Sequence, residues 1–174
     1  DYFEKQNFFA ISNVDTRALV RHIRDKGAMN AVLSTNLDMD YLRAELAKIP
    51  SMEGLELASS VSTQEAYTFG NPDAKYRISA LDLGIKRNIL RNFEKRDCYI
   101  KVFPFDTTFE EMQAFEPDGY FLSNGPGDPE PCDYAIRAIR EVLATDLPVF
   151  GICLGVQLLG LAAGATTVKM KFGH

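Results

Sequence analysis

The stretch from Pro148 to Gln157 constrains this chain more than any other, because an apolar run turns there directly into a helical pattern. It contains Cys153 between Gly151 and Gly155. A strand that turns sharply into a helix, with a reactive side chain at the turn, is a nucleophile elbow. In serine hydrolases the corresponding sequence motif is Gly-x-Ser-x-Gly. The flanking glycines suit a tight turn that leaves no room for Cβ atoms. The free N–H groups at the start of the helix favour a thiolate, the nucleophilic form of cysteine.

A simpler explanation of Cys153 is a small buried apolar residue, which most free cysteines are. The flanking glycines and the strand-to-helix turn favour catalysis instead. Cys98 begins an expected strand and Cys132 follows a proline-rich loop, so both are expected to be structural. Three widely spaced cysteines without a Cys-x-x-Cys pair argue against a disulfide framework and against a zinc site, so no metal is expected, and they fit a reducing cytoplasm.

From about residue 76 onward, short apolar strands alternate with helices. Strands are expected at 76–83, 98–103, 119–122 and 148–152, and residues 166–172 are expected to begin another strand. Helices are expected at 86–96, 109–115, 133–144 and 154–163. This alternation predicts βαβ units and a parallel, doubly wound α/β sheet. In such sheets the binding site lies beyond the carboxyl ends of the strands, where Cys153 is expected.

The loop 123–131 follows one of these strands and contains Gly125 and Gly127. One interpretation of this loop is an ordinary connecting turn between a strand and a helix. Its place beside the elbow also suits an oxyanion hole, with one N–H from this loop and one from Leu154. Gln157 lies one helical turn after the cysteine, where it is either a solvated helix residue or a group that holds substrate. The turn 82–88 is expected to be an ordinary strand-to-helix turn with a glycine at the bend.

The first part of the chain has a different pattern. Asp15 and Gly27 bracket a helix as N-cap and C′ residue, and Val14 and Leu19 suit a hydrophobic staple. A strand at 29–33, a helix at 40–49 and an irregular stretch at 51–74 are expected next. These patterns predict a domain at 1–58, a linker at 59–75 and a second domain at 76–174.

Composition excludes several classes of protein. The 24 acidic and 19 basic residues give a net charge of −5, which does not suggest a nucleic-acid partner. No apolar run reaches the roughly 20 residues that span a bilayer, so no membrane partner is expected. The two histidines, His22 and His174, stand far from the elbow in sequence, and neither is expected to be the catalytic base.

Several motifs together resemble a known family. Residues 151–157 are similar to the nucleophile motif of class I glutamine amidotransferases, and residues 123–129 resemble their oxyanion loop. Residues 14–27, 82–90 and 167–174 resemble segments of the small, glutamine-hydrolysing chains of carbamoyl phosphate synthetases. The resemblance covers essentially the whole sequence.

The resemblance implies a truncated, flavodoxin-like class I amidotransferase sheet, preceded by the C-terminal part of a smaller α/β domain. It implies that Cys153 attacks the side-chain amide of glutamine and forms a thioester. The N–H groups of Gly125 and Leu154 would form the oxyanion hole, and Gly125, Gly127, Leu154 and Gln157 would hold glutamine. Ammonia would pass to a separate large chain that uses ATP and Mg²⁺ to make carbamoyl phosphate for pyrimidines and arginine. No cofactor is expected in this chain itself.

The sequence departs from the family pattern in two ways. Val156 stands where a histidine is common, and little consequence is expected. The catalytic His and Glu of the family belong to a His-x-Glu motif that does not occur here, so we expect an internal fragment with little glutaminase turnover. Two alternatives stay open: another class I amidotransferase, which the helix at 16–26 argues against, and a non-catalytic binding module that retains the elbow.

Overall fold

The computed structural model describes residues 2–171, which form two compact units. One unit holds the residues up to Ile49 together with those from Lys169 onward, and the other is Pro50–Val168. No helix of the described residues is long and apolar enough to cross a membrane. Each unit is described by itself below.

The first unit contains helices α1 (Tyr2–Lys5), α2 (Thr16–Lys26) and α3 (Met39–Ala47). The caps of α2 confirm the prediction: the Asp15 carboxylate accepts from the N–H of Ala18 at 2.9 Å, and the N–H of Gly27 donates to Ile23 at 2.8 Å. Val14 and Leu19, the predicted staple pair, are 42% and 51% exposed. Gly27 is the only buried residue among the described residues of this unit, so these residues alone do not enclose a core.

Two expected strands are wrong. Residues 29–33 form no strand, and neither do residues 166–171, while residue 172 lies outside the described part of the chain. One backbone hydrogen bond, from the N–H of Ala28 to the oxygen of Lys171 (3.1 Å), connects the ends of these stretches. A strand needs a ladder of such bonds, and neither stretch has strand conformation over its described residues.

The second unit is built on a sheet of five strands: β1 (Tyr67–Phe69), β2 (Tyr76–Leu81), β3 (Cys98–Phe103), β4 (Gly119–Leu122) and β5 (Val149–Gly151). Their order is β1-β3-β2-β4-β5. All neighbours are parallel except β1, which pairs antiparallel with β3. The parallel sheet predicted from the alternation of strands and helices is therefore confirmed.

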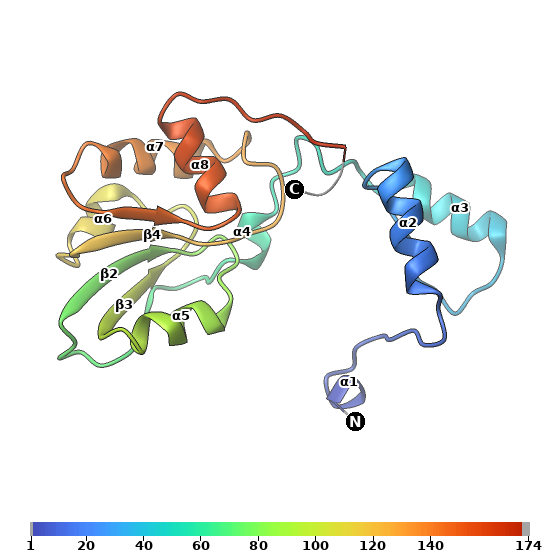
Figure 1. Ribbon diagram of the computed structural model, residues 1–174, viewed down its shortest axis with the longest axis horizontal. Helices are drawn as coiled ribbons and strands as arrows, with labels where there is room; N and C mark the ends of the chain where they lie inside the picture. Colours follow the sequence, from blue (N-terminus) through green and yellow to red (C-terminus); the bar gives the residue numbers. More distant parts are fainter. Residues whose placement is uncertain (1, 172–174) are drawn as a thin grey trace. The chain divides into compact units, whose positions relative to one another are not determined.

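Five helices accompany the sheet: α4 (Ala58–Val61), α5 (Arg87–Glu94), α6 (Phe109–Gln113), α7 (Asp133–Leu143) and α8 (Leu154–Ala162). Helix α5 covers one face, and α7 and α8 cover the other (Figure 1). Successive strand residues supply the two cores. Phe121 packs with Leu90 of α5, whereas Leu122 packs with Ile139 of α7 and Leu158 of α8. Burial on both faces explains why the strands read as continuous apolar runs.

The stretch 51–74, expected to be irregular, contains α4 and β1. Ala58 is fully buried, and Phe69 pairs with Ile100 in the sheet. Residues 59–75, predicted as a linker, therefore lie inside the second unit, which begins at Pro50. A three-residue strand and a four-residue helix are too short to show a hydrophobic period. The ends of the remaining predicted elements agree with the structure to within two residues.

The register of the sheet brings the carboxyl ends of its central strands to one level. Leu81 at the end of β2 is paired with Leu122 at the end of β4, and Leu122 is paired with Gly151 at the end of β5. The loops that follow these strands therefore begin side by side, which is where the sequence predicts the site.

Candidate active site

Cys153 occupies the turn between β5 and α8. Its backbone has φ 53° and ψ −113°, a conformation that costs a non-glycine residue about 1–3 kcal/mol. The residue is exposed, while its neighbour Leu154 is buried at the start of α8. This is the turn geometry that the sequence predicts for a nucleophile elbow, and the role of Cys153 as the nucleophile stays a prediction.

The two glycines beside the elbow are required by close backbone contacts. A Cβ on Gly155 would lie 2.2 Å from the carbonyl oxygen of Leu122, and one on Gly151 would lie 2.6 Å from the carbonyl carbon of Gly155. Neither contact can be relieved by rotating a side chain, since both involve backbone atoms. The glycine spacing read from the sequence therefore has a steric cause in this fold.

The loop after β4, residues 123–132 and hereafter the oxyanion loop, packs directly against the elbow. The N–H of Gly155 donates to the oxygen of Ser123 at 3.1 Å. The Cys153 Sγ lies 4.0 Å from the carbonyl oxygen of Gly125. A Cβ on Gly125 would lie only 2.1 Å from the oxygen of Leu83. The predicted neighbourhood of Gly125 and Cys153 is confirmed.

The two N–H groups predicted to form the oxyanion hole are free to receive a substrate oxygen. Among the described residues, no acceptor is bonded to the N–H of Gly125 or to that of Leu154, the first residue of α8. The other N–H groups at the start of this helix have partners: Val156 and Gln157 both donate to the oxygen of Cys153. The oxyanion role itself stays a prediction.

Gln157 and Gly127 are the other residues predicted to contact glutamine. Gln157 is exposed one turn along α8, and its predicted role in holding glutamine stays a prediction. Gly127 lies in the oxyanion loop with φ +94°. A Cβ there would lie 2.7 Å from the oxygen of Leu55 and 2.9 Å from the nitrogen of Leu57. Its place in the loop is therefore determined by the segment that precedes α4.

Sequence reasoning missed Asn124, which clamps the oxyanion loop to the turn after β2. Its Nδ2 donates to the oxygen of Gly84 at 2.8 Å, and its Oδ1 accepts from the N–H of Lys86 at 3.3 Å. The hydroxyl of Ser123 accepts from the N–H of Leu83 at 2.8 Å. The turn 82–88, expected to be an ordinary connection, is therefore one wall of the site. The only signal in the sequence was an amide side chain at a strand end.

Asp82 stabilises the turn 82–88 through hydrogen bonds to its backbone. Its side chain is buried and accepts three backbone N–H bonds, from Thr63 (2.8 Å), Gly84 (2.9 Å) and Ile85 (2.7 Å). A buried carboxylate needs several donors to offset its lost hydration. These bonds connect the end of α4 to the turn that holds Asn124.

Neither histidine supplies a base within the second unit. His22 lies exposed on α2 of the first unit, and His174 lies outside the described residues. Burial raises the pKa of Cys98 and of Cys132, which supports their structural assignment. Among the described residues no cluster of His, Cys, Asp and Glu could hold a metal ion.

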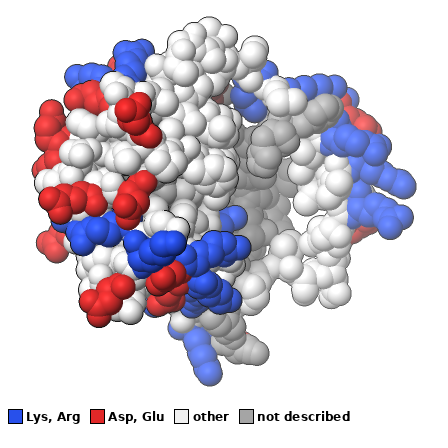
Figure 2. Space-filling view, turned by 60° about the vertical axis from the view of Figure 1, so that its left-hand side comes forward, with Lys and Arg blue, Asp and Glu red and all other residues white. Residues whose placement is uncertain are grey.

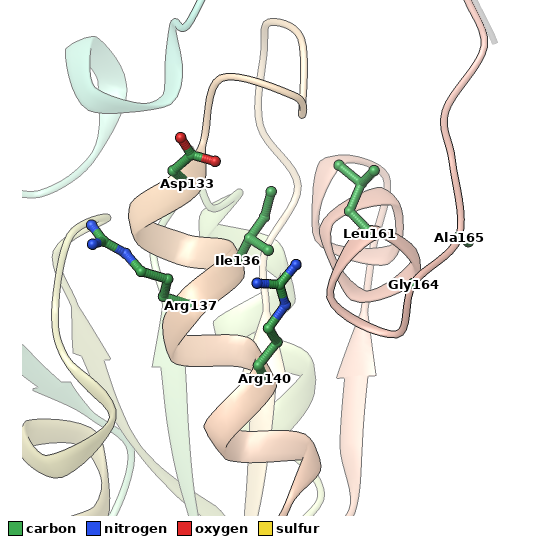
Figure 3. A pocket seen from close by; sticks show the side chains of 7 residues that line it. All are labelled: Asp133, Ile136, Arg137, Arg140, Leu161, Gly164 and Ala165. Atoms are coloured by element: carbon green, nitrogen blue, oxygen red, sulfur yellow. The ribbon is translucent and has the colours of Figure 1, made fainter.

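A hollow in this unit lies away from the elbow. It measures about 550 Å³ and lies between α7 and the end of α8 (Figure 3). Its lining residues are Asp133, Ile136, Arg137, Arg140, Leu161, Gly164 and Ala165. None of the predicted site residues lines it, and Figure 3 shows Arg140 on the side of α7 that faces α8 and Arg137 on the opposite side.

Figure 2 shows one face of the molecule, on which acidic and basic side chains are interspersed. Basic side chains predominate at its right-hand edge, while the whole chain carries a net charge of −5. A nucleic-acid partner requires a continuous basic footprint. The absence of a nucleic-acid partner stays a prediction.

Comparison with known proteins gives matches over both units. The family model described as "Carbamoyl-phosphate synthase small chain, CPSase domain" matches residues 1–33. A carbamoyl phosphate synthase small chain from Vibrio parahaemolyticus is 49% identical over 100% of this chain and 50% of its own length. Relatives of the same name from Escherichia coli K12 and Chlorobaculum tepidum are 47% and 54% identical, over 99% and 94% of this chain.

The chain spans about half the length of the curated relatives it matches. The family model described as "Glutamine amidotransferase class-I" matches residues 79–174, which include the elbow and the oxyanion loop and make up more than half of the chain. The chain therefore belongs to the class I glutamine amidotransferase family.

Proposed function

We propose that this chain carries the glutamine-hydrolysing site of a carbamoyl phosphate synthetase small chain. The observation that carries the proposal is the contact between the strained Cys153 turn and the oxyanion loop, with two N–H groups that have no acceptor among the described residues. The match of residues 1–33 to the synthetase small-chain model favours this enzyme over other class I amidotransferases.

The reaction would proceed in two steps at Cys153. The sulfur attacks the side-chain amide carbon of glutamine, and the carbonyl oxygen gains negative charge in the tetrahedral intermediate. The N–H groups of Gly125 and Leu154 would stabilise that charge, a contribution of about 3–4 kcal/mol per donor in related sites. The C–N bond breaks, the amide nitrogen takes a proton and leaves as ammonia, and water then hydrolyses the thioester to glutamate.

A histidine base would have to come from outside residues 50–168, since that unit contains no histidine. The base would deprotonate the thiol and later activate water, and it would protonate the leaving nitrogen. Ammonia would pass to a large chain that uses ATP and Mg²⁺, so this chain needs no cofactor of its own. A cytoplasmic location is part of the same proposal.

A single substitution distinguishes glutamine-dependent from ammonia-dependent carbamoyl phosphate formation. In the full-length protein with its large partner chain, Cys153→Ser should abolish carbamoyl phosphate formation from glutamine and leave formation from added ammonia unchanged. The side chain is exposed, so the substitution should not unfold the unit. Loss of both activities, or retention of glutamine use, would contradict the proposed role of Cys153.

A further inference from the structure

The oxyanion loop is held on its outer side by a short segment that no sequence motif marks. This segment, residues 54–59 and hereafter the strap, begins a few residues after the start of the second unit and leads into α4. Glu56 forms an isolated antiparallel bridge with Gly127. The N–H of Asp128 donates to the oxygen of Leu55 at 3.0 Å, and the N–H of Gly54 donates to the Asp128 carboxylate at 2.8 Å.

Gly127 lies so close to the backbone of the strap that no side chain fits between them. A Cβ there would meet both Leu55 and Leu57 of the strap at less than 3 Å. The strap therefore determines how far the middle of the oxyanion loop lies from the core. Gly125, whose carbonyl oxygen faces the Cys153 sulfur at 4.0 Å, is only two residues away.

The Glu56 side chain fixes the strap to the helix that follows the loop. Its Oε1 accepts from the hydroxyl of Tyr134 at 2.8 Å and from the N–H of Ser59 at 2.9 Å, and its Oε2 accepts from the Ser59 hydroxyl. Tyr134 lies in the first turn of α7, directly after the loop, and its ring packs edge-on against Phe105 at 5.0 Å. Burial, with hydrogen bonds to Cys132 and Glu56, raises the pKa of Tyr134, so its hydroxyl stays a donor.

We propose that Glu56 is a positioning residue for glutamine hydrolysis, because its bond to Tyr134 and the bridge of its backbone to Gly127 together hold the oxyanion loop against Cys153. The residue touches no reacting atom and acts through the loop. This inference rests on the proposed glutaminase function. A donor misplaced by about 1 Å can cost up to a hundredfold in rate, so the effect of loosening the strap is measurable.

The test uses the full-length protein with its partner chain and compares Glu56→Ala, Glu56→Gln and Tyr134→Phe. Glu53→Gln is the matched control. Glu53 is exposed on the segment that precedes the strap, and this substitution removes the same charge as a substitution of Glu56. Rates are normalised to reactive Cys153, so that loss of folded protein does not count as loss of turnover. Glu56→Ala should lower kcat/KM for glutamine about tenfold. Glu56→Gln should restore most of it, since an amide oxygen still accepts from Tyr134.

Two further measurements separate positioning from mere stability. Tyr134→Phe should reduce kcat/KM by itself, yet add little in the Glu56→Ala background, because both remove one shared bond. Alkylation of Cys153 by iodoacetamide should be faster in Glu56→Ala than in Glu53→Gln, since the loop residue Gly125, whose oxygen lies 4.0 Å from the sulfur, is held less closely. This readout does not depend on glutamine, so it tests the positioning role even where Cys153→Ser shows that the proposed function is wrong. Equal kcat/KM and equal alkylation in Glu56→Ala and Glu53→Gln would overturn the inference.

Discussion

The amide of Gly155 donates a hydrogen bond to the carbonyl oxygen of Ser123 at 3.1 Å. This bond connects the first turn of α8, directly after Cys153, to the first residue of the oxyanion loop. The same glycine leaves no space for a Cβ, which would lie 2.2 Å from the oxygen of Leu122. The relative position of Cys153 and the oxyanion loop is therefore set mainly by backbone contact, and small changes at position 155 should have large effects.

The first prediction compares two glycines of the same helix. Gly155→Ala should lower the free energy of unfolding by roughly 2–3 kcal/mol, because the new methyl group meets fixed backbone. Gly160→Ala should raise it by about 0.5–1 kcal/mol, because the only atom near its Cβ is that of Ala165 at 3.8 Å and alanine favours a helix. Denaturant unfolding of the two variants checks this opposition of sign. Two variants of equal stability would contradict the packing of α8 against β4.

The second prediction concerns the oxyanion loop and compares two glycines of matched backbone conformation. Gly127 has φ +94° and Gly164 has φ +90°, so an alanine at either position bears a similar backbone strain of about 1–2 kcal/mol. Gly127 alone faces backbone atoms, whereas no atom lies within 4 Å of a Cβ at Gly164. Gly127→Ala should therefore reduce kcat/KM for glutamine about tenfold or more, and Gly164→Ala should not change it. An equal loss in both would trace the effect to strain alone.

The third prediction concerns the three thiols. Cys153 is exposed, while Cys98 and Cys132 are 8% and 1% exposed and burial raises the pKa of each. A thiol reagent added to native protein at neutral pH should therefore modify one cysteine rapidly and the other two only as the protein unfolds. Peptide mapping should locate the rapid site at Cys153, and Cys153→Ser should remove it. Rapid labelling of Cys132 would mean that the core beneath the oxyanion loop is open.

The core of the site was predictable because its constraints are local in sequence. The glycines around Cys153 lie within two residues of it, and the apolar run before it marks a strand end, so the elbow follows from one short stretch. The neighbourhood of Gly125 followed from one further step, since parallel strands bring their carboxyl ends together. The sheet itself followed from the alternation of strands and helices, which burial on both faces makes easy to recognise.

The supports of the site were not predictable for the opposite reason. Glu56 and Tyr134 are far apart in sequence, and neither stands in a motif, so only the folded chain brings their side chains within 2.8 Å. Asn124 was read as part of a turn, because its two bonds go to another loop. Strand β1 was missed because its three residues owe their conformation to pairing with β3 rather than to a sequence pattern.

The fourth prediction follows from the protonation of Glu56. Burial acts to raise the pKa of this carboxyl group, but the hydrogen bonds from Ser59 and Tyr134 outweigh it and hold the pKa below its ordinary value of 4.5. A lowered pKa means that the ionised form stabilises the folded state. This contribution is complete above pH 4.5 and is lost as the pH falls through the lower, folded-state pKa.

Glu56→Gln should therefore reduce stability by about 1 kcal/mol at neutral pH, a value kept small because the group is only half-buried. The difference from wild type should shrink as the pH falls below 4.5, because the wild-type carboxyl group then becomes neutral as well. Unfolding midpoints measured from pH 7 to about pH 3 check this convergence, with Glu53→Gln as a control that should follow wild type throughout. A difference that stays constant or widens on acidification would show that the Glu56 carboxylate does not hold the strap through its charge.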